Sequence, residues 1–119
     1  MLSFNEMGLS PAIIKGVEEL GFENPTPIQQ KVIPTFLGNE NDIVGLAQTG
    51  TGKTAAFGLP IIEQIDLKNK SVQALVLAPT RELCMQISRD LQEYSRYVKG
   101  VKVVPVYGGA SIDTQIRAL

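Results

Sequence analysis

Residues 47–54, A-Q-T-G-T-G-K-T, constrain the fold of this 119-residue chain more than any other stretch. They follow an apolar run and open a helical pattern. Gly50 and Gly52 allow backbone N–H groups to converge on one phosphate, and a helix starting near Lys53 adds its positive dipole end. The lysine can reach the β- and γ-phosphates, and the Thr54 hydroxyl can bind Mg²⁺. The pattern, with Ala47 in place of its first glycine, predicts a phosphate loop for a nucleoside triphosphate.

Apolar runs and helical patterns alternate along the chain. The apolar runs predict strands at 42–47, 71–79 and 101–107. The helical patterns predict helices at 9–22, 26–38, 53–65, 80–98 and 110–119. This order predicts an α/β fold with a parallel sheet and crossover helices on both faces. The nearly continuous apolar run at 71–79 is typical of a strand covered on both faces.

Composition indicates that the chain can form a core and that it belongs in a reducing compartment. Hydrophobic residues make up 44% of the sequence, which is enough for a core. The single cysteine, Cys84, allows no internal disulfide, and the first ten residues show no signal pattern, so we expect a reduced, cytoplasmic protein. Without histidine, a structural zinc site is not expected.

Charge is distributed unevenly. Residues 1–66 carry three lysines against eight acidic residues, a net −5, and residues 67–119 carry eight basic against four acidic residues, a net +4. The second part is therefore expected to face a polyanion, although scattered charges of this kind also mark a solvated surface.

The sequence argues against guanine as the base of the bound nucleotide, because the guanine-reading motif of the common GTPases is missing. That class reads guanine with N-K-x-D, and here Val72 stands where the aspartate of "NKSV" would be. The D-x-x-G at 42–45 precedes the phosphate loop, which is the wrong order.

Four stretches together resemble the DEAD-box RNA helicases. They are "GFENPTPIQ" at 21–29, the phosphate loop at 47–54, "PTREL" at 79–83 and "GG" at 108–109. The resemblance spans the whole chain and suggests a bacterial member. It implies a partial RecA-like P-loop domain, with residues 1–119 as the N-terminal portion of the first of two domains, ending before the D-E-A-D sequence. Residues 1–38 would then be adenine-reading helices, and 39–119 would hold the phosphate loop and the first RNA-contact motifs.

The resemblance implies an ATP and Mg²⁺ site. Gln29 would read adenine, since a carboxamide can donate and accept at once. Thr26 and Gln29 also form a T-x-x-Q capping box, and both roles cannot use the same amide fully. Phe4 would stack on the base, or else anchor the terminus on the first helix. Phosphate and metal binding would fall to the loop, with Lys53 and Thr54 as its catalytic members and Thr54 as the metal ligand: Ala47, Gln48, Thr49, Gly50, Thr51, Gly52, Lys53 and Thr54.

RNA is the second ligand that the resemblance implies. Pro79, Thr80 and Arg81 would grip its backbone where a strand gives way to a helix. Thr80 could instead be only an N-cap. Gly108 and Gly109 would make a second backbone contact, or only a turn. Contacts of this kind predict no sequence specificity.

Two features of the chain argue against turnover by this chain alone. The sequence contains no D-E-A-D to hold Mg²⁺, and it lacks the S-A-T and T-P-G-R motifs of the family. We therefore expect weak adenine-nucleotide binding without hydrolysis, within a protein whose activity is ATP-dependent RNA unwinding. In the family's sheet other strands lie between those predicted here, so exposed edges and self-association are also expected. The alternatives are a non-catalytic P-loop module or another P-loop NTPase.

Overall fold

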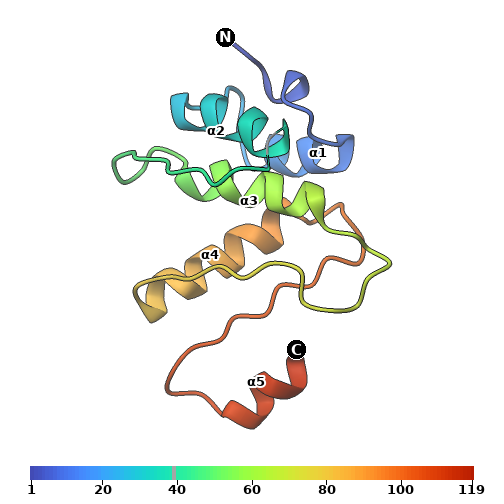
Figure 1. Cartoon of the computed structure of the whole chain (residues 1–119), viewed down its shortest axis with the longest axis vertical. Coiled ribbons are helices and arrows are strands. Elements are labelled where there is room, and N and C mark those ends of the chain that lie inside the picture. The colour runs from blue at the N-terminus through green and yellow to red at the C-terminus, as the bar shows by residue number, and fades with distance from the viewer. Residues whose placement is uncertain (39) are drawn as a thin grey trace.

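Helices account for the regular secondary structure of residues 1–38 and 40–119, the part of the chain that the computed structural model describes (Figure 1). One short 3-10 turn and five α-helices follow in order: η1 (Phe4–Glu6), α1 (Pro11–Glu19), α2 (Pro27–Gly38), α3 (Lys53–Gln64), α4 (Arg81–Tyr94) and α5 (Ile112–Ala118). Every predicted α-helix is therefore confirmed. None of these helices is long and apolar enough to cross a membrane.

The helix starts follow from local sequence. α1 and α2 each begin at a proline, which suits the first helical position because it lacks the N–H that would be left unpaired there. The Thr80 hydroxyl accepts the Leu83 N–H at 3.1 Å and caps α4. α4 ends at Tyr94, four residues before the predicted end, where the Ser95 hydroxyl donates to the Leu91 carbonyl at 2.8 Å.

The core lies among the first four α-helices, which are stacked down the molecule in Figure 1. α3 is its centre, and Leu59 on this helix is fully buried. α1 crosses α4 so closely that a Cβ on Gly16 would lie 2.9 Å from the Tyr94 carbonyl oxygen. The buried apolar side chains are Phe4, Met7, Leu9, Ile13, Ile14, Val17, Ile33, Ala55, Leu59, Ile62, Ile87, Leu91 and Tyr94.

The predicted parallel sheet is wrong for this chain. In the described residues, the segments predicted as strands, 42–47, 71–79 and 101–107, carry no strand structure. They run as irregular traces past the helices in Figure 1, and within the described residues no backbone hydrogen bond joins two of them. A β-ladder needs backbone hydrogen bonds to a second strand about 4.8 Å away, and none joins these segments in the described residues.

The same segments show why their apolar pattern misled. Val76 and Ala78 pack against the core, but the alternating Leu75 and Leu77 are 80% and 85% exposed. One face of this segment is therefore covered and the other is open, so the prediction of cover on both faces is wrong. An apolar sequence indicates that a segment would be stable as a buried strand. Whether the segment is buried depends on the elements that pack against it.

α5 lies apart from the core, at the opposite end of the molecule from the N-terminus in Figure 1, and none of its residues is buried. Its first turn carries Asp113 and its last turn Arg117, which suits the helix dipole. Hydrogen bonds join it to the segment before it: Gln115 pairs with Tyr107, and the Lys102 ammonium donates to the Ala118 carbonyl.

Candidate functional site

The phosphate loop closes onto the first turn of α3. Gly50 and Gly52 have φ of +75° and +83°, the left-handed region that glycine favours. A Cβ on Gly52 would lie 2.3 Å from Gln29 Nε2, so a side chain there would displace the Gln29 carboxamide. The Thr51 hydroxyl donates to the Gln48 carbonyl at 2.6 Å and tightens the loop. Gly52 is therefore required by both conformation and space.

The start of α3 fits a phosphate group bound with Mg²⁺. The first helical hydrogen bond runs from the Ala56 N–H to the Gly52 carbonyl at 3.1 Å. The N–H groups of the preceding turn therefore lie at the positive end of a twelve-residue helix. Lys53 begins this helix with an exposed side chain, and Thr54 follows it. A cation, a hydroxyl and backbone donors are the groups that a phosphate–Mg²⁺ pair needs.

Gln29 joins α2 to the phosphate loop. The Gln29 Oε1 accepts the Thr26 backbone N–H at 3.0 Å, and the Gln29 backbone N–H donates to the Thr26 hydroxyl at 3.5 Å. These two bonds complete the capping box. Its Nε2 donates to the Gly52 carbonyl at 3.2 Å. The side chain is 2% exposed. The box could be predicted from spacing, but the bond to Gly52 could not, because it joins residues far apart in sequence.

Phe4 lies in the core. Its ring packs against Phe22, with centroids 6.4 Å apart, and Phe22 in turn meets Tyr94 edge-on at 6.0 Å. This is the anchoring arrangement that was the alternative to base stacking. The stacking role stays a prediction.

The two predicted RNA-contact motifs meet at the start of α4. The Arg81 guanidinium lies 4.8 Å from the ring centroid of Tyr107. A Cβ on Gly109, whose φ is +86°, would come within 3.0 Å of Arg81 Nη1. Pro79, Thr80 and Gly108 are exposed beside them. Thr80 also caps α4, which is the role that the sequence offered as the alternative to an RNA contact. Its RNA contact stays a prediction.

Pro79, Thr80, Arg81, Gly108 and Gly109 form a second cluster, apart from the first cluster of Gln29 and the phosphate loop. Two residues of this second cluster were missed from sequence. The Tyr107 ring contacts the Arg81 guanidinium, and the Gln115 carboxamide makes hydrogen bonds with both the N–H and the carbonyl of Tyr107. A tyrosine directly before a glycine pair could have suggested the first. Nothing local could have found the second, because its partner lies in another element.

Shifted pKa values belong to groups outside these clusters. Burial, with a smaller effect of Asp90, raises the pKa of Tyr94 to about 12, and Tyr94 belongs to the core. The Glu19 hydrogen bond raises the pKa of Tyr97, which also lies under the Lys15 ammonium. Tyr94 therefore serves packing, and Tyr97 joins α1 through Glu19 and Lys15. Among the described residues no group of three acidic, cysteine or histidine side chains could hold a metal ion.

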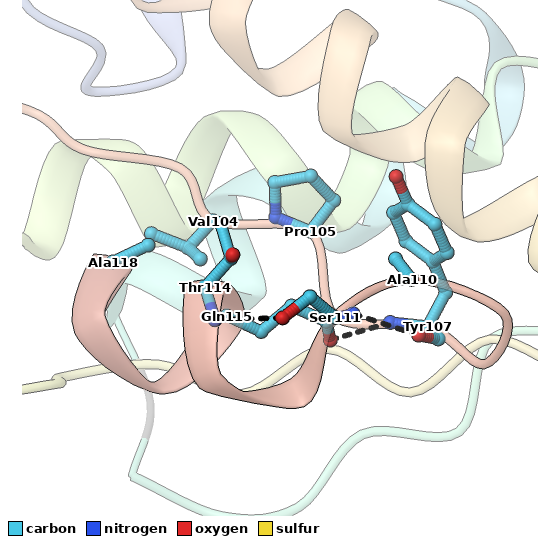
Figure 2. Close-up of a pocket in the computed structure, with 8 residues that line it drawn as sticks. All are labelled: Val104, Pro105, Tyr107, Ala110, Ser111, Thr114, Gln115 and Ala118. Atoms are coloured by element: carbon cyan, nitrogen blue, oxygen red, sulfur yellow. Dashed lines mark hydrogen bonds between the residues drawn. The ribbon is translucent and has the colours of Figure 1, made fainter.

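Two cavities flank the clusters. One of about 220 Å³ lies between α2 and α3 beside Lys53, lined by Val32, Phe36, Ile43, Gly45, Lys53, Ala56 and Phe57. Its walls are apolar apart from the lysine, so it does not resemble a phosphate site. The other, of about 270 Å³, lies between residues 104–107 and α5 and is drawn in Figure 2.

A family comparison decides the affiliation of the chain. The family model described as DEAD/DEAH box helicase matches residues 26–119. The chain belongs to this family. It is 56% identical over all its 119 residues to the DEAD-box ATP-dependent RNA helicase CshA of Geobacillus kaustophilus, and it spans 25% of that relative.

Solved structures agree with this affiliation. A DEAD box protein from the hyperthermophile Methanococcus jannaschii superposes with a TM-score of 0.88 at 43% identity, over the whole of this chain and 32% of that one. Saccharomyces cerevisiae Dbp5 bound to RNA and ADP BeF3 gives a TM-score of 0.78 at 32% identity, over 92% of this chain and 29% of that one. The chain thus spans about a quarter to a third of the length of these relatives.

Proposed function

We propose that this chain is the nucleotide-binding and first RNA-contacting part of an ATP-dependent RNA helicase. One observation carries the nucleotide half: the bond from Gln29 to Gly52 makes the predicted adenine reader and the phosphate loop one unit. Two similar proteins support the assignment: CshA is an ATP-dependent RNA helicase, and Dbp5 has been solved bound to RNA and ADP BeF3. The lone cysteine suits a reducing compartment, and we propose the cytoplasm.

The capping box and the Gly52 bond leave part of the Gln29 carboxamide unused, so the competition between capping and adenine reading that the sequence suggested is only partial. A glutamine side chain offers two N–H donors and two acceptor lone pairs. The capping bond uses one lone pair and the Gly52 bond uses one N–H. One donor and one acceptor remain, which is the pair that the N7 and N6 edge of adenine requires. Adenine would then be read by a group whose orientation the phosphate loop already holds.

The loop would bind the phosphates through backbone N–H groups and Lys53. Bound Mg²⁺ would neutralise phosphate charge and orient the terminal phosphate, with the Thr54 hydroxyl among its ligands. Arg81, Thr80 and the Gly108–Gly109 backbone would contact an RNA backbone at the second cluster. For this chain alone we propose weak nucleotide binding without turnover, since its sequence has no D-E-A-D.

Thermal melts with Mg²⁺ and ADP, ATP or GDP test the nucleotide proposal. A ligand that binds only the folded chain raises the midpoint by mass action. We expect a rise with ADP and ATP and none with GDP. Gln29→Glu keeps the acceptor for Thr26 but removes the donor to Gly52, so it should abolish the preference for adenine.

Gln30→Glu is the matched control for charge. Gln30 is the next residue on α2, and its amide donates to the Pro25 carbonyl instead of the loop. This variant should keep the adenine preference. An equal midpoint shift with GDP and ADP in the unmodified chain would contradict the proposal. Phosphate release that disappears in Lys53→Ala would contradict the absence of turnover.

We also propose that exposed apolar side chains on the extended segments promote self-association at high concentration. Val44 and Leu46 are 86% and 89% exposed, and Leu75 and Leu77 resemble them. Light scattering over a wide concentration range should show the apparent mass rising. A constant monomer mass would contradict this.

A further inference from the structure

We infer that Tyr107 and Gln115 are positioning residues that hold Arg81 ready for an RNA phosphate. This inference rests on the proposed function and adds two residues to it. Three features of the molecule support it: a clamp on the Tyr107 backbone, a contact between its ring and Arg81, and a guanidinium with no carboxylate partner among the described residues.

The clamp is the carboxamide of Gln115. The Tyr107 N–H donates to its Oε1 at 3.1 Å, and its Nε2 donates to the Tyr107 carbonyl at 2.9 Å (Figure 2). Both backbone groups of one residue are therefore tied to one planar group, which fixes the orientation of that residue. Among the described residues, no other backbone segment pairs with residues 101–107. The Gln115 side chain therefore restrains the backbone where a neighbouring strand otherwise would.

The ring contact follows from the clamp. Figure 2 shows the ring of Tyr107 pointing away from α5, and Arg81 of α4 lies over its face at 4.8 Å. The neighbouring Val106 carbonyl lies 3.6 Å from the Cys84 sulfur, one turn further along α4. The segment before the glycine pair is thus fastened on one side to α5 and on the other to α4.

The guanidinium remains available for an anion. A ring below its face leaves the N–H donors at its edge free for bidentate contact with a phosphate. The ion pair of the described chain joins Arg96 to Glu19, and Arg81 has no carboxylate partner there. The backbone of Gly109 lies beside it with no side chain between. The direction of Arg81 is therefore set by Tyr107 and Gly109.

The test is binding of a short fluorescein-labelled oligouridylate to the chain, followed by anisotropy over a range of salt concentrations. Arg81→Ala should weaken binding about tenfold and lower the salt slope by about one. Gln115→Ala and Tyr107→Leu should each weaken it about two- to fivefold, the equivalent of an exposed cation–π contact. Because Gln115 acts through Arg81, the double variant that combines Arg81→Ala with Gln115→Ala should bind no more weakly than Arg81→Ala alone.

Two variants serve as controls. Gln73 makes the same two-way clamp on the Asp66 backbone, at 2.9 Å for both bonds, and belongs to neither cluster. Gln73→Ala should therefore bind RNA like the unmodified chain. Tyr107→Phe keeps the ring and should do the same. In parallel, the Arg81 Nε–H resonance should lose its ring-current shift in Gln115→Ala and Tyr107→Leu and keep it in Gln73→Ala.

The outcomes separate the inference from the proposed function. If Arg81→Ala weakens binding while Gln115→Ala and Tyr107→Leu do not, the inference is wrong and the RNA contact stands. If the two positioning variants add their full effect to that of Arg81→Ala, they do not act through the arginine. If Arg81→Ala leaves binding unchanged, the proposed RNA contact itself is overturned, and the role of its positioning residues with it.

Discussion

The stacked helices α1–α4 and the three extended segments both carry large apolar side chains but differ in how they bury them. Leu59 on α3 is fully buried, whereas Leu77 in the second segment is 85% exposed. A helix satisfies its backbone internally and needs only one packed face. An extended segment needs a neighbour along each edge as well as cover. Stability in this chain therefore resides in the helical layer.

The largest effect that separates the two regions should come from paired leucine truncations. Leu59→Ala leaves a cavity in the core and should lower the free energy of unfolding by about 2–5 kcal/mol. Leu77→Ala removes the same atoms from an exposed site and should change it by about 0.5 kcal/mol or less. Urea unfolding measures both. Equal losses would show that the extended segments contribute to the folded core.

Titration of Tyr94 should destabilise the helical layer at high pH. Its pKa is raised to about 12 by burial, above the ordinary value of 10. The folded state holds the proton more tightly, so this contribution to stability is complete below pH 10 and is lost as pH rises towards 12. The loss should not exceed about 2.7 kcal/mol, the free-energy equivalent of a pKa raised from 10 to about 12. Unfolding measured against pH should be flatter for Tyr94→Phe, and an unchanged slope would contradict the assignment.

The close crossing of α1 and α4 provides a smaller test. Gly16→Ala would place a Cβ 2.9 Å from a backbone oxygen that cannot move alone, and should cost about 1–2 kcal/mol. Gly38→Ala, at the end of α2 with nothing within 4 Å, is the control and should be neutral or slightly stabilising. Thermal midpoints compare them. A stabilised Gly16→Ala would mean that the two helices are not in close contact.

The smallest effect should come from the caps. The Thr80 hydroxyl makes a capping bond on α4, and Thr80→Ala should cost about 1 kcal/mol. Ser10 stands before α1 but makes no such bond with its side chain, so Ser10→Ala should cost less. Denaturant midpoints distinguish the two variants. The reverse order would contradict the assigned caps.

Local features of this chain could be predicted and long-range features could not. Prolines at the first helical positions, the Thr26–Gln29 box and the Thr80 cap all involve residues within one turn of each other. The sheet failed because a strand depends on distant neighbours that sequence alone does not place. The bonds from Gln29 to Gly52 and from Gln115 to Tyr107 were missed for the same reason. Sequence therefore located the two clusters but not the contacts that assemble them.

Amide hydrogen exchange with and without Mg²⁺ and ATP tests most directly whether Gln29 and the phosphate loop act as one nucleotide site. The account predicts that peptides covering 26–30 and 47–56 gain protection together, while the segment 71–79 exchanges rapidly in both conditions. Protection of the loop with no change at 26–30 would contradict the coupling through the Gln29–Gly52 bond. No change in either peptide would contradict the nucleotide site itself.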